Sequence, residues 1–233
     1  MDSNTITVGV LCIQGAFIEH IHKLTTLSST DKHRDLTITI VEVREPGQLS
    51  DLDGLIIPGG ESTTLSVFLR KNEFEQTLKA WISDKQRPGV VWGTCAGLII
   101  LADDVVGQKL GGQVTIGGLN IQCTRNMYGR QNKSFESAIK LHHPPLHAAQ
   151  PTSAPPPFPL ADDECHGIFI RAPGILKVNS PDVKVLASVN DDNIVAVQQD
   201  HLIATSFHPE LTSDFRWHSY FVDQIKQHRY PQY

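Results

Sequence analysis

The sequence predicts an α/β protein with a mostly parallel central sheet flanked by helices and with an antiparallel extension. In the first half, short runs of branched apolar residues alternate with segments of helical periodicity, which is typical of parallel strands covered on both faces. In the second half, from Val114 to Val197, most segments are short and strand-like. We expect these later strands to extend the sheet in antiparallel fashion.

The first half alternates strand and helix in chain order. A β-branched run from Thr5 to Ile13 ends in a Gln-Gly turn and leads into a helical pattern over Phe17 to Leu24. Further strands are expected at Leu36–Val43, Leu55–Ile57 and Gly89–Trp92, and further helices at Leu65–Leu69, at Phe74–Trp81 and from Leu98. Ser62 or Thr63 is expected to cap the helix that carries Leu65.

The second half contains the remaining strands, a helical tail and one irregular segment. The expected strands are Leu119–Cys123, Ser137–Leu141, Gly167–Ile170, Val183–Val189, Ile194–Val197 and Leu202–Phe207, followed by a helix over Asp214–His228. The segment from His142 to Asp163 holds half of the chain's 14 prolines, and proline has no N–H to donate to a sheet. We therefore expect a mobile surface insertion at about residues 142–163 within a single domain spanning residues 1–233.

Three histidines in this insertion raise the question of a metal site. They are His142, His143 and His147, and no carboxylate at suitable spacing accompanies them. Exposed histidines in such a loop are more often polar surface than ligands. We expect no metal.

Composition argues against several classes of function. The net charge is −5 and no dense block of Lys or Arg occurs, so nucleic acid and anionic membranes are poor partners. No apolar run approaches the roughly 20 residues of a membrane span, and the polar N-terminus is unlike a signal peptide. Four separated cysteines, with no Cys-x-x-Cys pair, fit reduced thiols. We expect a cytoplasmic protein.

One cysteine lies in a setting that suits a nucleophile. Cys95 is the centre of the sequence Gly93-Thr94-Cys95-Ala96-Gly97, between a buried strand and an apolar helix. Small residues there allow a sharp turn that projects the thiol at the carboxyl end of the sheet. The helix N-terminus favours negative charge, and the N–H of Ala96 is placed to bind an oxyanion. Taken alone, the pattern also fits a small buried cysteine in a tight turn.

A second motif supplies a base and a carboxylate. His208 and Glu210 lie two residues apart after the last expected strand. In extended backbone such residues face the same side, so Glu210 can hold the imidazole in the tautomer that accepts the thiol proton. In this triad Cys95 attacks, His208 acts as base and then as acid, and Glu210 orients His208. The alternative is a surface histidine beside a strand-terminating proline.

A glycine pair ends a third strand. In Pro58-Gly59-Gly60-Glu61-Ser62-Thr63-Thr64, glycines permit close approach of the backbone to a ligand, and their N–H groups can complete an oxyanion hole. Read as structure only, this segment is the entry to a helix.

Five separated segments share one resemblance. They are Val8–Gly15, Gly59–Thr63, Arg125–Gln131, Phe169–Pro173 and Ser206–Glu210. Together they resemble the glutaminase subunits of pyridoxal 5'-phosphate synthases, within the triad, or class I, glutamine amidotransferases. The match runs from about Val8 to the C-terminal helix, interrupted by the proline-rich insertion. Gly60-Glu61-Ser62 distinguishes this family from other triad glutaminases.

The resemblance implies a class I glutamine amidotransferase-like fold and a role for each matching residue. Cys95, His208 and Glu210 form the implied triad, and Gly60 and Ala96 the implied oxyanion hole. The implied contacts to glutamine are Gly60, Glu61, Ser62, Arg125, Ile170 and Arg171. This is chemically sensible, because an arginine suits the substrate carboxylate, whereas Glu61 or a backbone carbonyl suits the ammonium.

The implied activity is hydrolysis of L-glutamine to glutamate and ammonia, with no metal or organic cofactor. In the family, a separate synthase subunit combines the ammonia with a pentose phosphate and a triose phosphate to build pyridoxal 5'-phosphate, or vitamin B6. Docking in this hetero-oligomer activates hydrolysis, so the chain alone is expected to be a poor glutaminase.

Other functions stay open at this point. The chain could be a triad glutaminase of another biosynthetic pathway, or a non-catalytic regulatory subunit of the same complex. A cysteine peptidase with a similar turn would also fit the nucleophile, but it would leave Arg125 and Arg171 without a role.

Overall fold

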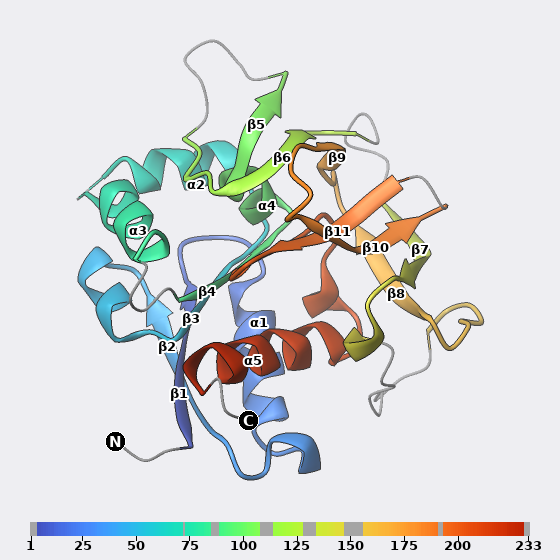
Figure 1. Cartoon of the computed structure of the whole chain (residues 1–233), viewed down its shortest axis with the longest axis horizontal. Helices are drawn as coiled ribbons and strands as arrows, with labels where there is room; N and C mark the ends of the chain where they lie inside the picture. Colours follow the sequence, from blue (N-terminus) through green and yellow to red (C-terminus); the bar gives the residue numbers. More distant parts are fainter. Residues whose placement is uncertain are drawn as a thin grey trace.

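The computed structural model of the chain describes residues 4–71, 73–84, 89–107, 114–127, 134–146, 156–190 and 193–230, except for the side chain of residue 31. These residues form two β-sheets and five α-helices (Figure 1). Short 3₁₀ turns join them: η1 (Asp31–His33), η2 (Pro46–Asp51), η3 (Pro144–Leu146) and η4 (Pro209–Leu211). Within the described part, no helix is both long and apolar enough to cross a membrane.

Five parallel strands make up one half of the larger sheet. They are β1 (Thr5–Leu11), β2 (Thr37–Val43), β3 (Gly54–Ile57), β4 (Val90–Thr94) and β12 (Leu202–Thr205). Their order is β2-β1-β3-β4-β12, so the last strand of the chain pairs with β4. The carboxyl ends of parallel strands meet at one edge. The segments that follow β3, β4 and β12 are the Gly-Gly turn, the Cys95 turn and the His208 motif.

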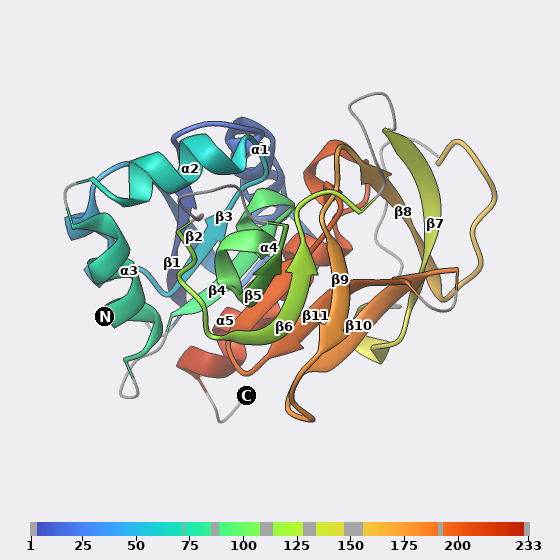
Figure 2. The same cartoon turned by 90° about the horizontal axis from the view of Figure 1, so that it is seen from above.

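Helices cover both faces of this parallel half (Figure 1, Figure 2). One face carries α1 (Phe17–Leu27) and α5 (Arg216–Arg229), and the other carries α2 (Ser62–Leu69), α3 (Phe74–Ile82) and α4 (Ala96–Leu101). Within β3, Leu55 and Ile57 pack into the core on the α2 side, whereas Ile56 packs into the core on the α1 side. Alternate side chains thus enter two hydrophobic cores, which explains the continuously apolar strands.

The other half of the sheet is antiparallel. Outward from β12 it contains β11 (Asn193–Gln199), β10 (Lys184–Val189), β7 (Phe135–Leu141) and β8 (Glu164–Phe169). The predicted α/β class, a mostly parallel central sheet flanked by helices with an antiparallel extension, is therefore confirmed, and the parallel strands form one half of the sheet. The outer strand β8 also contacts the segment after β12, where the His208 N–H donates to the Ile168 carbonyl at 2.8 Å. This brings the end of β8 to the edge that carries Cys95.

Three strands form a smaller sheet that the sequence did not reveal as a unit. They are β5 (Ala102–Val106), β6 (Leu119–Thr124) and β9 (Gly174–Val178), in the order β5-β6-β9. Only β6 was predicted. β5 begins where α4 ends and contains two aspartates, which are uncommon in strands, so neither a turn nor composition marks it.

The first part of the proline-rich insertion packs against the rest of the chain. Pro144–Leu146 forms η3, Leu146 is fully buried, and Arg216 Nη1 donates to the Leu146 carbonyl at 3.4 Å. Leucine can bury its side chain despite the prolines beside it. Residues 147–155 lie outside the described residues, and 156–163 have no regular secondary structure.

The histidines of the insertion serve local packing. His142 Nε2 lies 2.8 Å from Ser188 Oγ, and the His143 ring packs edge-on against Tyr220. His147 lies outside the described residues. Among the residues that are described, no cluster of His, Cys, Asp and Glu could hold a metal ion.

Candidate active site

Cys95 occupies a sharp turn between β4 and α4. Its φ of 48° and ψ of −101° are values that residues other than glycine seldom adopt. A Cβ at Gly93 would lie 2.5 Å from the Gly97 carbonyl, and a Cβ at Gly97 would lie 2.1 Å from the Ile57 carbonyl oxygen. The turn therefore requires glycine at both positions, in agreement with the predicted strand-to-helix elbow.

His208 and Glu210 lie beside Cys95 at the end of β12. The Nδ1 atom of His208 is 2.7 Å from Glu210 Oε1. Burial lowers the pKa of His208, but its hydrogen bonds to Cys95 and Glu210 and the charges of both groups outweigh burial and raise this pKa to about 10. His208 can therefore hold a proton beside the sulfur at neutral pH.

The backbone between His208 and Glu210 differs from our expectation. We predicted an extended chain, but Pro209 begins η4, and His208 has φ of −108° and ψ of 82°. The two side chains converge across the start of a turn and not along a strand. The predicted contact is present, although the reason given for it was wrong.

The Gly-Gly turn after β3 lies against this pair and is held by two further side chains. The Gly59 N–H donates to Thr94 Oγ1 at 2.9 Å. The amide of Gln14 accepts from the Glu61 N–H at 2.8 Å and donates to the Glu61 carbonyl at 3.1 Å. Gly60 has φ of 148°, and a Cβ there would lie 2.6 Å from the Gln14 amide. Only glycine suits this position, and the N–H of Gly59 is already engaged.

Glu61 caps α2, which corrects the prediction of Ser62 or Thr63 as the cap. Its Oε2 accepts from the Thr64 N–H at 2.7 Å. Burial raises the pKa of Glu61, but hydrogen bonds from Thr63 and Thr64 outweigh it and leave the pKa below its ordinary value. An ionised carboxylate is the better acceptor at the positive end of a helix. The Ser62 hydroxyl instead accepts from Arg125 at 2.8 Å.

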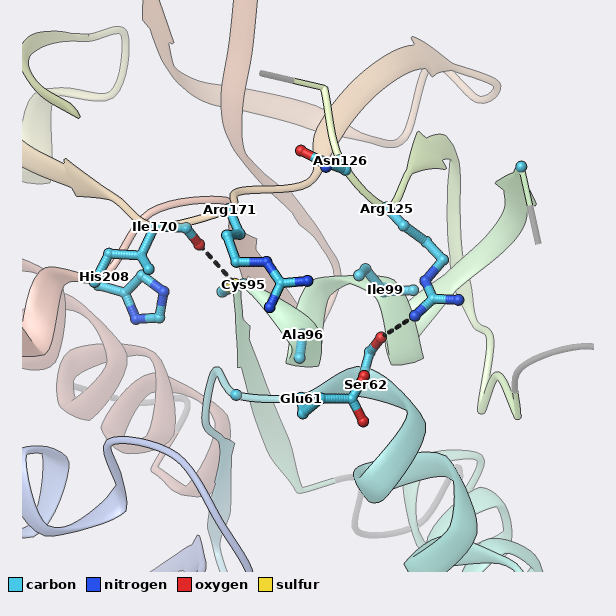
Figure 3. A pocket seen from close by; sticks show the side chains of 12 residues that line it. Glu61, Ser62, Cys95, Ala96, Ile99, Arg125, Asn126, Ile170, Arg171 and His208 are labelled. Carbon is cyan, nitrogen blue, oxygen red and sulfur yellow. Dashed lines mark hydrogen bonds between the residues drawn. The ribbon is translucent and has the colours of Figure 1, made fainter. Parts of the chain in front are cut away.

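A pocket of about 460 Å³ opens over Cys95 (Figure 3). Its volume falls within the roughly 300–1,000 Å³ typical of small-molecule sites. Nine of the predicted site residues line it: Gly60, Glu61, Ser62, Cys95, Ala96, Arg125, Ile170, Arg171 and His208. Glu210 is the predicted site residue that does not line the pocket, since it lies buried behind His208.

Two arginines reach this pocket from different elements. Arg125 follows β6, and Arg171 follows β8 with a positive φ of 48°. Figure 3 shows Arg171 on the Cys95 side of the pocket and Arg125 on the Ser62 side. Cys95 Sγ lies 3.9 Å from the carbonyl oxygen of Ile170. The pocket thus combines a thiol and an imidazole with two cations, which suits a small substrate that bears a carboxylate.

Comparison with known proteins identifies the family. The model of the SNO glutamine amidotransferase family matches residues 10–227. The chain belongs to this family. Of the five segments that carried the resemblance, residues 128–131 lie outside the described part of the chain.

Similar proteins agree with this assignment. The probable pyridoxal 5'-phosphate synthase subunit PDX2 of Arabidopsis thaliana is 41% identical over 95% of this chain and 87% of that protein. The pyridoxal 5'-phosphate synthase subunit PdxT of Streptomyces avermitilis is 39% identical over 98% of each. A crystal structure of a glutamine amidotransferase is 35% identical, with a TM-score of 0.75 over 94% of this chain and 98% of that one.

Several residues of this family member's site were missed by sequence reasoning. Ile99 and Asn126 line the pocket, Gln14 and Thr94 hold the Gly-Gly turn, and His20 lies behind Glu210. Gln14 and Asn126 fall inside the segments that carried the resemblance, which could have drawn attention to them. The signal for His20 is a polar residue on the apolar face of a helical pattern.

Proposed function

We propose that this chain is the glutaminase subunit of a pyridoxal 5'-phosphate synthase. It hydrolyses the side-chain amide of glutamine and passes the ammonia to a synthase subunit. The observation that carries the proposal is the convergence of Cys95, His208 and Glu210 beneath a pocket that also holds two arginines. Relatives that are named as subunits of pyridoxal 5'-phosphate synthases support the choice of pathway.

The reaction begins at Cys95. Protonated His208 stabilises the thiolate, which attacks the amide carbon of glutamine and forms a tetrahedral oxyanion. The N–H groups of Gly60 and Ala96 bind this oxyanion. Ala96 suits the role because it is the first residue of α4, where N–H groups have no partner within the helix.

His208 then works as acid and as base. It donates its proton to the departing ammonia as the C–N bond breaks, which leaves a thioester on Cys95. It next takes a proton from water, which attacks the thioester and releases glutamate. Glu210 keeps the imidazole in one orientation through Nδ1 during both steps. These steps use no metal or organic cofactor.

The pocket positions the two charged groups of glutamine. Arg125 or Arg171 binds the carboxylate, and Glu61 or a backbone carbonyl binds the ammonium. The α2 cap uses Oε2 of Glu61, and a carboxylate has a second oxygen with which to accept. Gly60, Ser62 and Ile170 complete the contacts around the substrate.

The acceptor of the ammonia is a synthase subunit. In water, free ammonia becomes ammonium, which is not a nucleophile, so the complex needs a protected route between the two subunits. Free thiols at all four cysteines support a cytoplasmic location. The continuous sheet that joins both halves of the chain supports a single domain over residues 1–233.

Glutamate release tests this proposal. Wild type and Cys95→Ala are assayed with glutamine, each with and without a pyridoxal 5'-phosphate synthase subunit. We expect weak hydrolysis by wild type alone, strong hydrolysis with the synthase subunit, and none by Cys95→Ala. Activity that survives Cys95→Ala would show that Cys95 is not the nucleophile. Docking without hydrolysis would instead indicate a regulatory subunit, and hydrolysis that the synthase subunit does not stimulate would indicate another pathway.

A further inference from the structure

Helix α1 meets the far side of Glu210 with a buried histidine. His20 is fully buried, and its Nε2 lies 3.4 Å from Glu210 Oε2. The other carboxylate oxygen, Oε1, contacts His208. We propose that His20 is a positioning residue, which donates from Nε2 to Glu210 and thereby fixes the carboxylate that orients His208. This inference rests on the proposed glutamine hydrolysis.

The hydrogen-bond pattern around His20 determines which nitrogen carries the proton. His20 Nδ1 lies 2.9 Å from Nε2 of His218, whose Nδ1 is buried without a partner among the described residues. If His20 Nδ1 donated, His218 would carry its proton on the unpartnered Nδ1. The lone pair of His20 Nε2 would then face a carboxylate oxygen at 3.4 Å, although it could accept from the Thr94 hydroxyl at 3.5 Å. A buried N–H without an acceptor is costly. His218 therefore donates to His20, and His20 donates to Glu210.

The charge states agree with this direction. Burial lowers the pKa of both His20 and His218, so both rings are neutral near pH 7 and each has one proton to donate. Burial raises the pKa of Glu210, but His20 and His208 outweigh burial and leave this pKa below its ordinary value. An ionised carboxylate buried this deeply needs a donor for each oxygen. His208 contacts Oε1. Oε2 forms no hydrogen bond within the described residues, and His20 Nε2, at 3.4 Å, is the donor that we assign to it.

Lys23, one turn further along α1, fixes the backbone beyond Glu210. Its Nζ donates to the Thr212 carbonyl at 2.5 Å and to the Asp214 carbonyl at 3.3 Å. Residues three apart on a helix share one face, so His20 and Lys23 act on the same segment. α1 thus holds both the carboxylate and the chain that follows η4.

The same imidazole also lies near the Gly-Gly turn. His20 Nε2 is 3.5 Å from Thr94 Oγ1, the oxygen that accepts from the Gly59 N–H. The ring is oriented by an edge-on contact with Trp92, at 5.5 Å between centroids. A change at His20 should therefore disturb both the base, His208, and the proposed oxyanion hole. Such a change lowers kcat and leaves the affinity for substrate unchanged.

Two substitutions at His20 separate donation from packing. His20→Phe keeps a ring but removes the donor, whereas His20→Gln places an amide N–H near the position of Nε2. Removing a group that orients a catalytic residue costs about 10- to 100-fold where this has been documented for metal ligands. We expect a loss of this size in kcat for His20→Phe, an unchanged KM, and rescue by His20→Gln.

His33→Phe is the matched control. His33 is also buried and contacts α5, with Nε2 3.1 Å from Ser219 Oγ, and has no contact with the triad among those the structure shows. The kcat of His33→Phe should stay near that of wild type, although its melting temperature should fall about as much as that of His20→Phe. An unchanged kcat in His20→Phe, or an equal loss in His33→Phe, would overturn the proposal.

A second pair of variants tests the proposal even if His20→Phe does not fold. The amide N–H of His20→Gln reaches the Nε2 position, whereas that of His20→Asn reaches only the Nδ1 position. We expect a higher kcat for the glutamine variant. Equal values, or the reverse order, would refute donation from Nε2.

A further measurement separates this inference from the proposed function. The rate at which iodoacetamide alkylates Cys95 depends on His208 but needs no glutamine. We expect His20→Phe to slow it and His20→Gln to restore it. If wild type releases no glutamate but His20→Phe still slows alkylation relative to wild type, the proposed function alone is refuted. Normal alkylation and hydrolysis in His20→Phe would refute only the role of His20.

Discussion

The catalytic side of the pocket is buried, whereas the side that receives substrate is open. Cys95, His208 and Glu210 are 7%, 6% and 4% exposed, but Ile170 is 38% exposed and Arg171 is exposed as well. The triad follows parallel strands packed between two hydrophobic cores, whereas Arg171 lies beyond an edge strand. The reacting groups are thus held rigidly, and the substrate contacts have more freedom. Substitutions on the two sides should accordingly separate kcat from KM.

The largest effect on the buried side should come from Glu210→Gln. Glutamine keeps the shape of the side chain but can present its NH₂ group to His208, which favours the wrong tautomer. An equivalent change in a serine protease triad lowers kcat by about 10⁴-fold, so we expect a loss of this order. Glutamate release and a synthase-binding assay measure it. If binding is lost together with activity, Glu210 is a structural residue and not an orienting one.

Gly60→Ala should give the next largest loss of activity, because the Gly59-Gly60 turn borders both the buried and the open side of the pocket. Its φ of 148° and the nearby Gln14 amide leave no room for a Cβ. Strain of about 1–3 kcal/mol in the turn corresponds to a loss of about 10- to 100-fold in kcat if the oxyanion hole is displaced. Gly47→Ala is the control, since a Cβ there meets nothing within 4 Å. Equal activities of the two variants would show that the turn does not bind the oxyanion.

On the open side, Arg171→Gln should raise KM and leave kcat nearly unchanged. A hydrogen bond to a charged group contributes roughly 1.5–3 kcal/mol, which corresponds to an increase in KM of about 10- to 100-fold. Arg70→Gln, at an exposed arginine after α2, controls for the loss of a surface charge. A fall in kcat without a change in KM would instead place Arg171 among the groups that act on the transition state.

The buried side was also the easier one to predict from sequence. Strands β1, β3 and β4 are buried on both faces, so they show as apolar runs closed by small residues. The Cys95 turn requires glycines that are visible in the sequence. In that turn the backbone geometry requires a particular residue type, so the local sequence is enough to predict the structure.

The features that sequence reasoning missed depend on contacts between distant segments. β5 and β9 become strands only because β6 lies between them. His20 contacts Glu210 from the other end of the chain, and Gln14 contacts the turn after β3 in the same way. The cap of α2 was mistaken because Ser62 binds Arg125, which follows β6 of the smaller sheet. Local propensity contains none of this information.

The smallest effect on activity should come from the proline-rich insertion. Leu146 is fully buried, so Leu146→Ala should lower the free energy of unfolding by about 2–5 kcal/mol. Deleting residues 147–155, with a short glycine-serine bridge, should leave glutamate release unchanged because residues on either side keep their contacts. Urea unfolding and activity assays measure the two effects. If the deletion abolishes only the stimulation by the synthase subunit, residues 147–155 belong to the docking interface.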